Sequence, residues 1–271
     1  MPLSALQPSG KKQTMTSHLS ILKLAVGGLI ASAAIGAMAQ EGHAPAHAHW
    51  DYRGKLGTKA WGDLEPGFAT CKLGKHQSPV NIKVSQAKKA ALEPIRFDYT
   101  GSAGEAVNTG HTVQVNLAEG GGIGLAEGEF KLVQFHFHTP SEERIDGKAY
   151  PMVVHMVHKN DAGQLAVVAV LLKEGKENAA LKPVFDALPG QPGQAEPLKI
   201  ALNPSDLLPA KHDYYHFTGS LTTPPCSEDV SWQVLRQPVE ISKGQLAAFR
   251  KLYRMNARPV QPLNGRVLEQ S

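Results

Sequence analysis

The stretch FKLVQFHFH, residues 130–138, decides which fold this sequence predicts. Its aromatic and β-branched residues, which alternate with polar ones toward the end, are typical of a strand. Successive side chains of a strand point to opposite faces, so Gln134, His136 and His138 share one face. Phe135 and Phe137 share the other face. The stretch therefore predicts a strand with one aromatic core face and two histidines close enough to reach one metal ion.

A second stretch, MVVHMVH (152–158), offers a third histidine. The same alternation places Val153, His155 and Val157 on one face of a half-buried strand and His158 on the other. If the two strands are neighbours, His155 completes a set of three imidazoles. Such a set leaves the fourth tetrahedral position for water, which is the arrangement of a catalytic zinc. The alternative is a set of hydrogen-bonded core histidines, and His158 is expected to be one of these.

The rest of the chain predicts a mainly β domain with short peripheral helices. Further strands are expected in two alternating stretches and in one apolar run that would be buried on both faces, namely HTVQVNL (111–117), VSWQVL (230–235) and LAVVAVLL (165–172). Ser242 and Gln245 form a capping box, and Ile241 and Leu246 a hydrophobic staple, so a helix is expected over 243–254. ENAALKPVFDAL (177–188) is weakly helical and contains Pro183. No linker or repeat follows Trp50, which predicts one domain over 50–271.

The first 39 residues have the pattern of a secretory signal peptide. An apolar run (24–36) precedes the cleavage signal Ala37-Met38-Ala39, with Lys11, Lys12 and Lys23 as basic residues. The run is too short for a comfortable membrane span, although an uncleaved anchor is the alternative. A start at Met15 would give a more usual length. Residues 40–49 are expected to be a flexible, His-rich N-terminus, and the mature protein to be periplasmic or secreted, with no membrane attachment.

Charge and cysteine content agree with an exported protein that binds no nucleic acid. The formal net charge is +4, and removal of residues 1–39 with their three lysines leaves +1. That gives no strong electrostatic case for nucleic acid or an anionic membrane. The two cysteines, Cys71 and Cys226, are expected to form a disulfide in an oxidising compartment. Two free buried thiols are the alternative.

Several segments, in order and spacing, resemble the α-class carbonic anhydrases, and specifically their exported bacterial branch. The segments are QSPVNI (77–82), NTGHTVQV (108–115), QFHFHTPSE (134–142), HMVHKN (155–160), LAVVAVLL (165–172), GSLTTPPCSE (219–228), WQVL (232–235) and NARPVQPLNGR (256–266). The resemblance covers roughly residues 50–266. It implies a central, twisted, largely antiparallel sheet of about ten strands, with cis peptide bonds at Ser78-Pro79 and Pro224-Pro225.

The resemblance also implies an activity, the reversible hydration of carbon dioxide to bicarbonate and a proton. His136, His138 and His155 would hold Zn²⁺, which lowers the pKa of its bound water to about 7, a value measured for carbonic anhydrase itself. The resulting hydroxide would attack carbon dioxide. Thr222 would accept a hydrogen bond from the hydroxide and donate one to Glu142. His111 matches the proton shuttle, because an imidazole with a pKa of about 6.5 exchanges protons with buffer.

Further residues match the family's substrate pocket and the partners of its ligands. The apolar pocket wall would consist of Val157, Val167, Leu221 and Trp232, with Thr222, Thr223 and Gln114 as polar lining. Gln134 would accept a hydrogen bond from His136, and the main-chain carbonyl of Asn256 one from His138. Many exported bacterial relatives are dimeric, which leaves a homodimer open, although the sequence shows no recognisable interface.

Two positions depart from the family pattern. The family usually has a glutamate two residues before its third ligand, and this chain has Val153 there, which cannot accept a hydrogen bond from His155. We therefore expect weaker or faster-exchanging zinc, unless another acceptor bonds His155, and Val153→Glu should then slow zinc loss. Phe217 replaces a tyrosine and removes one hydroxyl near the threonine.

Other function classes remain as alternatives at this stage. A metal-dependent cupin would use Glu142 as a metal ligand together with His136 and His138, but the second cupin motif is absent and SLTTPP would be unexplained. A metallo-β-lactamase-like hydrolase would need a different sequence after His138. A non-catalytic zinc-binding relative on the same fold usually has broken ligands, and only Val153 favours it here.

Overall fold

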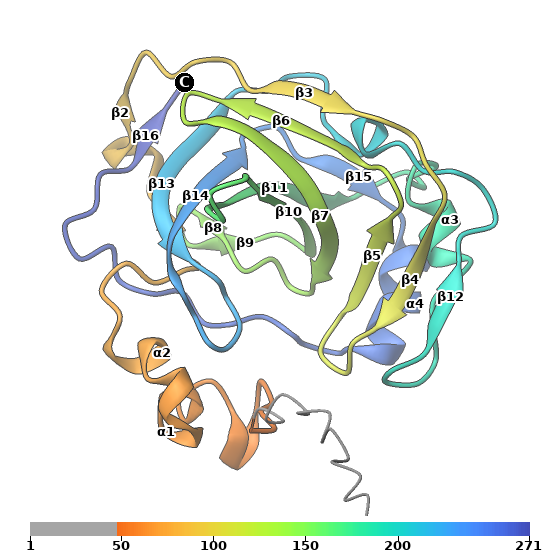
Figure 1. Cartoon of the computed structure of the whole chain (residues 1–271), viewed down its shortest axis with the longest axis horizontal. Helices are drawn as coiled ribbons and strands as arrows, with labels where there is room; N and C mark the ends of the chain where they lie inside the picture. The colour runs from red at the N-terminus through yellow and green to blue at the C-terminus, as the bar shows by residue number, and fades with distance from the viewer. Residues whose placement is uncertain (1–47) are drawn as a thin grey trace, which may run out of the picture. The chain divides into compact units, whose positions relative to one another are not determined.

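The computed structural model describes residues 48–271, and strands dominate its secondary structure (Figure 1). The α-helices are α1 (Trp61–Leu64), α2 (Thr70–Leu73), α3 (Lys182–Phe185) and α4 (Lys243–Leu252), and short 3₁₀ helices are η1 (Gly54–Leu56), η2 (Pro66–Phe68), η3 (Val84–Gln86) and η4 (Pro204–Leu207). The strands are β1 (Asn81–Ile82), β2 (Lys88–Lys89), β3 (Arg96–Tyr99), β4 (Gly104–Asn108), β5 (Val113–Leu117), β6 (Gly121–Leu125), β7 (Gly128–His138), β8 (Arg144–Ile145), β9 (Lys148–Ala149), β10 (Met152–Lys159), β11 (Leu165–Glu174), β12 (Ala195–Pro197), β13 (Tyr214–Ser220), β14 (Glu228–Leu235), β15 (Val239–Ile241) and β16 (Glu269–Gln270). The predicted signal peptide (1–39) and residues 40–47 of the predicted N-terminus lie outside the described residues.

Thirteen of the strands form one large twisted sheet, whose main path runs β12-β4-β5-β7-β10-β11-β14-β13-β16-β2. The pairings are mostly antiparallel, with parallel pairs at β11–β14, β11–β15 and β16–β2. The predicted mainly β fold with a twisted sheet is confirmed. The strand count exceeds the expected ten because β2, β12, β15 and β16 have only two or three residues, too few for a periodic pattern to reveal.

The strand that carries two of the histidines contains a β-bulge. The register between β10 and β7 shifts so that Val157 pairs with Gln134 but His158 pairs with Leu132, which leaves Val133 without a partner. An extra residue reverses the side-chain alternation beyond it. Phe130 therefore packs in the same core cluster as Phe135 and Phe137, despite the difference in parity.

The two faces of the central strands line different parts of the interior. Val154 and Met156 of β10 belong to the larger core cluster, together with Phe135 and Phe137 of β7. Val153 and Val157 belong to a second cluster with Val167 and Trp232. The expectation that β10 is only half buried is wrong, because Met152 to His158 are all buried. The strand lies between β7 and β11, and both of its faces are covered by other side chains. β11 is buried on both faces, as predicted.

The helices lie at the periphery, as predicted (Figure 1). α4 begins with the expected capping box, in which Ser242 accepts a hydrogen bond from the Gln245 backbone and the Gln245 side chain accepts one from the Ser242 backbone. Ile241 and Leu246 are both buried in the larger core cluster. α3 covers only 182–185 of the weakly helical 177–188, with Pro183 in its first turn.

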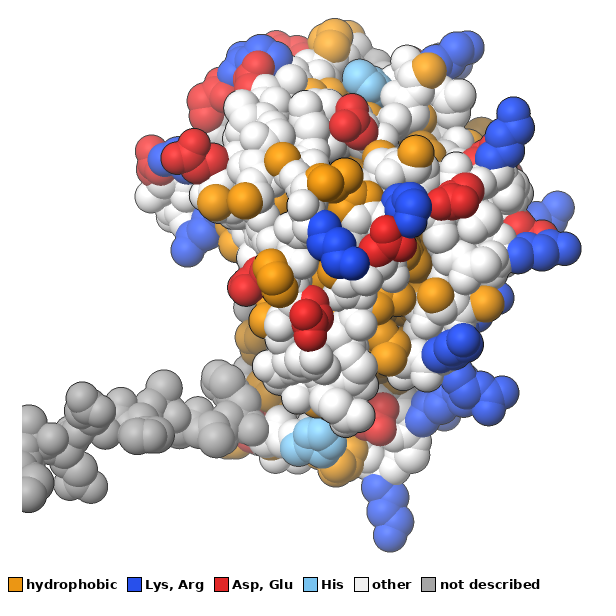
Figure 2. Space-filling view, turned by 90° about the vertical axis from the view of Figure 1, so that its right-hand side faces the viewer, with side chains coloured by type: hydrophobic (Ala, Val, Ile, Leu, Met, Phe, Trp, Pro, Cys, Tyr) orange, Lys and Arg blue, Asp and Glu red, His pale blue; other side chains and the backbone are white. Residues whose placement is uncertain are grey.

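A disulfide joins Cys71 to Cys226, which confirms the predicted pair. The predicted cis peptide bonds at Ser78-Pro79 and Pro224-Pro225 are present, and Thr139-Pro140 is also cis. Within residues 48–271, no helix has the length and hydropathy to span a membrane. The face shown in Figure 2 carries both acidic and basic side chains.

Candidate metal centre

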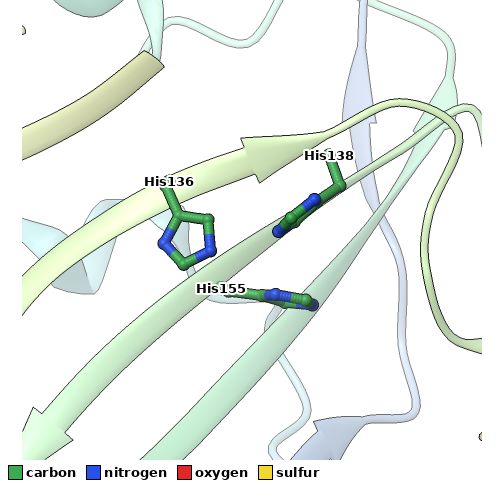
Figure 3. A group of neighbouring side chains, drawn as sticks. All are labelled: His136, His138 and His155. Atoms are coloured by element: carbon green, nitrogen blue, oxygen red, sulfur yellow. The ribbon is translucent and has the colours of Figure 1, made fainter. Parts of the chain in front are cut away.

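Two adjacent strands bring the three predicted histidines together (Figure 3). His136 and His138 lie on β7, and His155 on β10 stands directly opposite His136 in the antiparallel register. Each histidine offers one ring nitrogen within 4.8 Å of the others, and the group contains no carboxylate. The side-chain alternation thus predicted the three histidines that the fold brings together, and Glu142, which a cupin would use as a ligand, is not part of this group.

Hydrogen bonds to the outer ring nitrogens fix which nitrogen each imidazole presents to the centre. His136 Nδ1 lies 2.8 Å from Gln134 Oε1, and His138 Nδ1 lies 2.6 Å from the carbonyl oxygen of Asn256. Both oxygens can only accept, so each Nδ1 carries the proton and donates it. The Nε2 atoms are then unprotonated, and that of His138 is buried without a hydrogen-bond partner among residues 48–271. A buried acceptor in this state is well suited to a metal ion.

The third histidine presents the opposite nitrogen. His155 Nε2 lies 3.0 and 3.2 Å from the two carboxylate oxygens of Glu143. Since a carboxylate accepts, His155 donates from Nε2 and keeps Nδ1 free toward the other two rings. The donor set is two Nε2 atoms and one Nδ1 atom, all imidazole nitrogens, which suits zinc.

Burial keeps two of the three rings uncharged. Burial, with a smaller contribution from neighbouring His155, lowers the pKa of His136 to about 3 and the pKa of His138 well below its ordinary value. For His155, burial also acts to lower the pKa, but the carboxylates of Glu143 and Glu142 outweigh it and the pKa is raised. A metal ion competes with protons for such nitrogens, so metal binding here is linked to pH.

Glu142 and Thr222 lie beside the histidines. Burial raises the pKa of Glu142 to about 7, while the neighbouring His155, followed by hydrogen bonds from the Arg258 backbone and the Thr222 hydroxyl, acts to lower it. The Arg258 N–H lies 2.7 Å from Oε1 of Glu142. The Thr222 contact falls short of ideal geometry, and Oε2 has no well-aligned partner in the described part of the chain. Thr222 therefore has its hydroxyl directed at a carboxyl that a nearby cation would keep ionised.

Comparison with known proteins agrees with this geometry. The family model of eukaryotic-type carbonic anhydrases matches residues 56–271. The chain belongs to the α-class carbonic anhydrases. It is 43% identical to a carbonic anhydrase of Pectobacterium atrosepticum and 41% identical to one of Nostoc sp., over 81% of this chain and 90% and 85% of theirs. The α-carbonic anhydrase of Thermovibrio ammonificans, solved with the inhibitor sulfanilamide, matches with a TM-score of 0.81 and 46% identity over 83% of this chain and all of that one.

Hydration of carbon dioxide is the general reaction of this family. The residues that match the family's apolar substrate pocket lie together in the sheet. Val157 pairs with Val167, and Val167 pairs with Trp232. On the opposite side of β10, Val157 pairs with Gln134 of β7, so the row of paired residues also includes Gln134. Trp232 also lies 5.0 Å from the His155 ring, centroid to centroid. An apolar row therefore adjoins the three histidines on their own face of the sheet.

The loop after β13 carries the remaining matched residues. Leu221 and Thr223 are partly exposed and flank the buried Thr222. Disulfide-bonded Cys226 anchors this loop, and its N–H donates to the Thr223 carbonyl. On the other side of the histidines, Gln114 of β5 pairs with His136 and is also partly exposed. Phe217 has no hydroxyl to offer and stacks on Trp232.

His111, matched to the family's proton shuttle, stacks on Trp50. The two ring centroids lie 3.6 Å apart with nearly parallel planes, and His49 lies 6.2 Å away. Burial, followed by the charge of His49, lowers the pKa of His111, and Asp51 opposes this. The Trp50 contact could not be predicted from periodicity, because Trp50 lies in the segment before the first strand.

The prediction of weaker zinc binding held only if no other acceptor bonds His155, and the structure supplies such an acceptor. Val153 is buried in an apolar cluster and accepts nothing, but Glu143 from the loop after β7 reaches the outer nitrogen of His155. The sequence did contain a signal, since Glu143 directly follows Glu142 and is a second carboxylate beside the site. Arg258 was also missed, because it acts through its backbone N–H, which no side-chain pattern reveals.

Proposed function

We propose that this protein is a zinc enzyme that reversibly hydrates carbon dioxide to bicarbonate and a proton. The observation that carries the proposal is the set of three imidazoles, each with its outer nitrogen hydrogen-bonded and its inner nitrogen free. When bound there, zinc would lower the pKa of a water molecule so that it attacks carbon dioxide as hydroxide.

The neighbouring residues would orient the reactants. The Thr222 hydroxyl, which is directed at Glu142, would donate to it, so that its oxygen would accept from the attacking group and direct a lone pair toward carbon dioxide. The backbone N–H of Thr222 would bind a substrate oxygen. Val157, Val167, Leu221 and Trp232 would hold the apolar substrate close to the histidines.

Proton transfer would be carried out by His111. Its half-buried ring on Trp50 is held at the edge of the described domain, and a pKa below the ordinary histidine value keeps it neutral and ready to accept a proton near pH 7. The proton would then pass to buffer.

We further propose that residues 1–39 are a signal peptide and that the mature protein, with a catalytic domain over 50–271, is periplasmic or secreted. The Cys71–Cys226 disulfide supports this, because disulfides persist in oxidising compartments. A homodimer is part of the same proposal.

Stopped-flow hydration of carbon dioxide, with zinc counted on the same sample, tests the proposal. We expect fast hydration that scales with zinc at one ion per chain, disappears on chelation and returns when zinc is added. One tightly held zinc without hydration would contradict the proposal and favour a non-catalytic zinc-binding relative on the same fold.

A further inference from the structure

Glu143 supplies the only hydrogen bond to the outer nitrogen of His155 within residues 48–271. Both of its carboxylate oxygens face Nε2, at 3.0 and 3.2 Å, and Glu143 is fully buried. A buried carboxylate needs a hydrogen-bonding partner, and His155 provides it.

The backbone of Glu143 is fixed by its own loop. The Ser141 hydroxyl donates to the Glu143 carbonyl at 2.8 Å, and the Tyr150 N–H donates to the same hydroxyl at 2.8 Å. The Ser141 N–H in turn donates to the Tyr150 carbonyl. This loop therefore presents Glu143 to β10 from a defined position.

The adjacent glutamate serves a different partner. Glu142 accepts from the Arg258 backbone and faces Thr222, whereas Glu143 faces His155. Two consecutive carboxylates from one loop thus support the substrate-orienting threonine and one metal ligand.

The position on β10 that could otherwise supply an acceptor is apolar. Val153 lies two residues before His155 on the same face, pairs with Leu171 and His138 on the neighbouring strands, and is fully buried. Its side chain cannot accept a hydrogen bond, so the support of His155 comes from the loop after β7 and not from β10 itself.

We propose that Glu143 is a positioning residue that holds His155 with its proton on Nε2 and Nδ1 toward the metal, in place of an acceptor at position 153. This rests on the zinc site of the proposed function. The hydrogen bond fixes the tautomer and ring orientation and makes Nδ1 a stronger ligand. Its loss should loosen the metal even though all three ligands remain.

The test measures zinc release to a chromogenic chelator from the zinc-loaded protein. Glu143→Leu removes the acceptor and should speed release about 10–100-fold, a range measured in part on carbonic anhydrases themselves. Glu143→Gln keeps an uncharged acceptor oxygen, so its rate of zinc release should lie between the rates of Glu143→Leu and wild type. Glu177→Gln, on the exposed surface, is the matched control and should not change the rate.

A carboxylate introduced at position 153 tests whether His155 obtains its hydrogen-bond acceptor from position 143 or from position 153. Val153→Glu alone should not slow zinc release, because His155 already has its acceptor, but in the Glu143→Leu background it should restore release toward the wild-type rate. Unchanged release in Glu143→Leu, or slower release in Val153→Glu alone, would overturn the proposal.

A measurement on the unmodified protein covers the case in which the variants fail to fold. Long-range ¹H–¹⁵N spectra of the zinc-loaded wild type should show His155 protonated on Nε2, and a proton on Nδ1 would overturn the proposal. If wild type holds zinc and hydrates carbon dioxide but Glu143→Leu does not alter release, only the role of Glu143 fails. A wild type that binds no zinc overturns the proposed function as well.

Discussion

The two faces of β10 each bury a histidine, but the surroundings of the two rings differ. His155 and His158 are both almost completely inaccessible. His155 has a carboxylate on its outer nitrogen and two further imidazoles on its inner side. His158 has the Tyr99 hydroxyl at 2.8 Å from Nε2 and lies on the side of the larger core cluster. Burial of a histidine therefore does not identify a metal ligand, and what distinguishes His155 is the carboxylate on its outer nitrogen together with the two imidazoles on its inner side.

The charge behaviour of the two rings differs in the same way. Burial lowers the pKa of His158 to about 4, and hydrogen bonds to the backbone of Ala166 and Met156 oppose this only in part. For His155, the two carboxylates more than offset burial and raise the pKa. Replacing His155 should therefore affect zinc binding, whereas replacing His158 should affect only stability.

The largest expected effect comes from replacing the two histidines of β10 with alanine, one at a time. His155→Ala removes a ligand and should weaken zinc binding more than the ~10–100-fold that loss of a ligand's hydrogen-bond partner costs. His158→Ala should retain one zinc per chain and lose only stability. Competition with a chelator of known affinity measures both variants. If His158→Ala lost zinc as strongly as His155→Ala, the distinction between the two faces would be wrong.

A somewhat smaller effect is expected when the metal is kept and the polar contact beside it is removed. Thr222→Val preserves side-chain shape but eliminates the hydroxyl that faces Glu142. Misplacing the attacking group should lower the rate of carbon dioxide hydration roughly 100-fold, with zinc content unchanged. Stopped-flow kinetics and metal analysis on the same sample check this, and Thr218→Val, exposed on β13, is the control. A wild-type rate in Thr222→Val would contradict the orienting role.

The smallest of the three effects is the pH dependence of protein stability that the buried His158 contributes. The pKa of His158 is about 4 in the folded protein and about 6.5 when unfolded. Between these values the unfolded state binds more protons, so stability that is present above pH 6.5 is lost as pH falls toward 4. At pH 5 the loss is about 2 kcal/mol. Urea unfolding at pH 7 and pH 5 should show that His158→Gln loses less stability on acidification than wild type, and equal losses would contradict this account.

The alternation of side chains with a period of two residues predicted the two strands that carry the histidines, β7 and β10. The alternation in 134–138 and 152–158 selected the three histidines and placed Val157 on their face, and the register of β7 and β10 confirms both. The chain's resemblance to a family then supplied Gln134 and Asn256 as partners of two ligands, which the hydrogen bonds confirm.

What the sequence could not reveal depends on tertiary contacts. The bulge at Val133 changes which side chains of β7 share a face, and no local pattern marks it. Glu143 contacts His155 from a loop whose path is fixed by hydrogen bonds of Ser141 with Glu143 and Tyr150 and by the distant Arg258 backbone. The stacking of Trp50 on His111 likewise joins segments that only the fold brings together.

A crystal structure of the zinc-loaded protein, with anomalous data at the zinc edge, tests the central claim most directly. The account predicts one peak per chain, about 2.0–2.1 Å from Nε2 of His136, Nε2 of His138 and Nδ1 of His155, with Glu143 still bonded to Nε2 of His155. A peak held by Glu142 or Glu143, or one bound to Nε2 of His155, would contradict it.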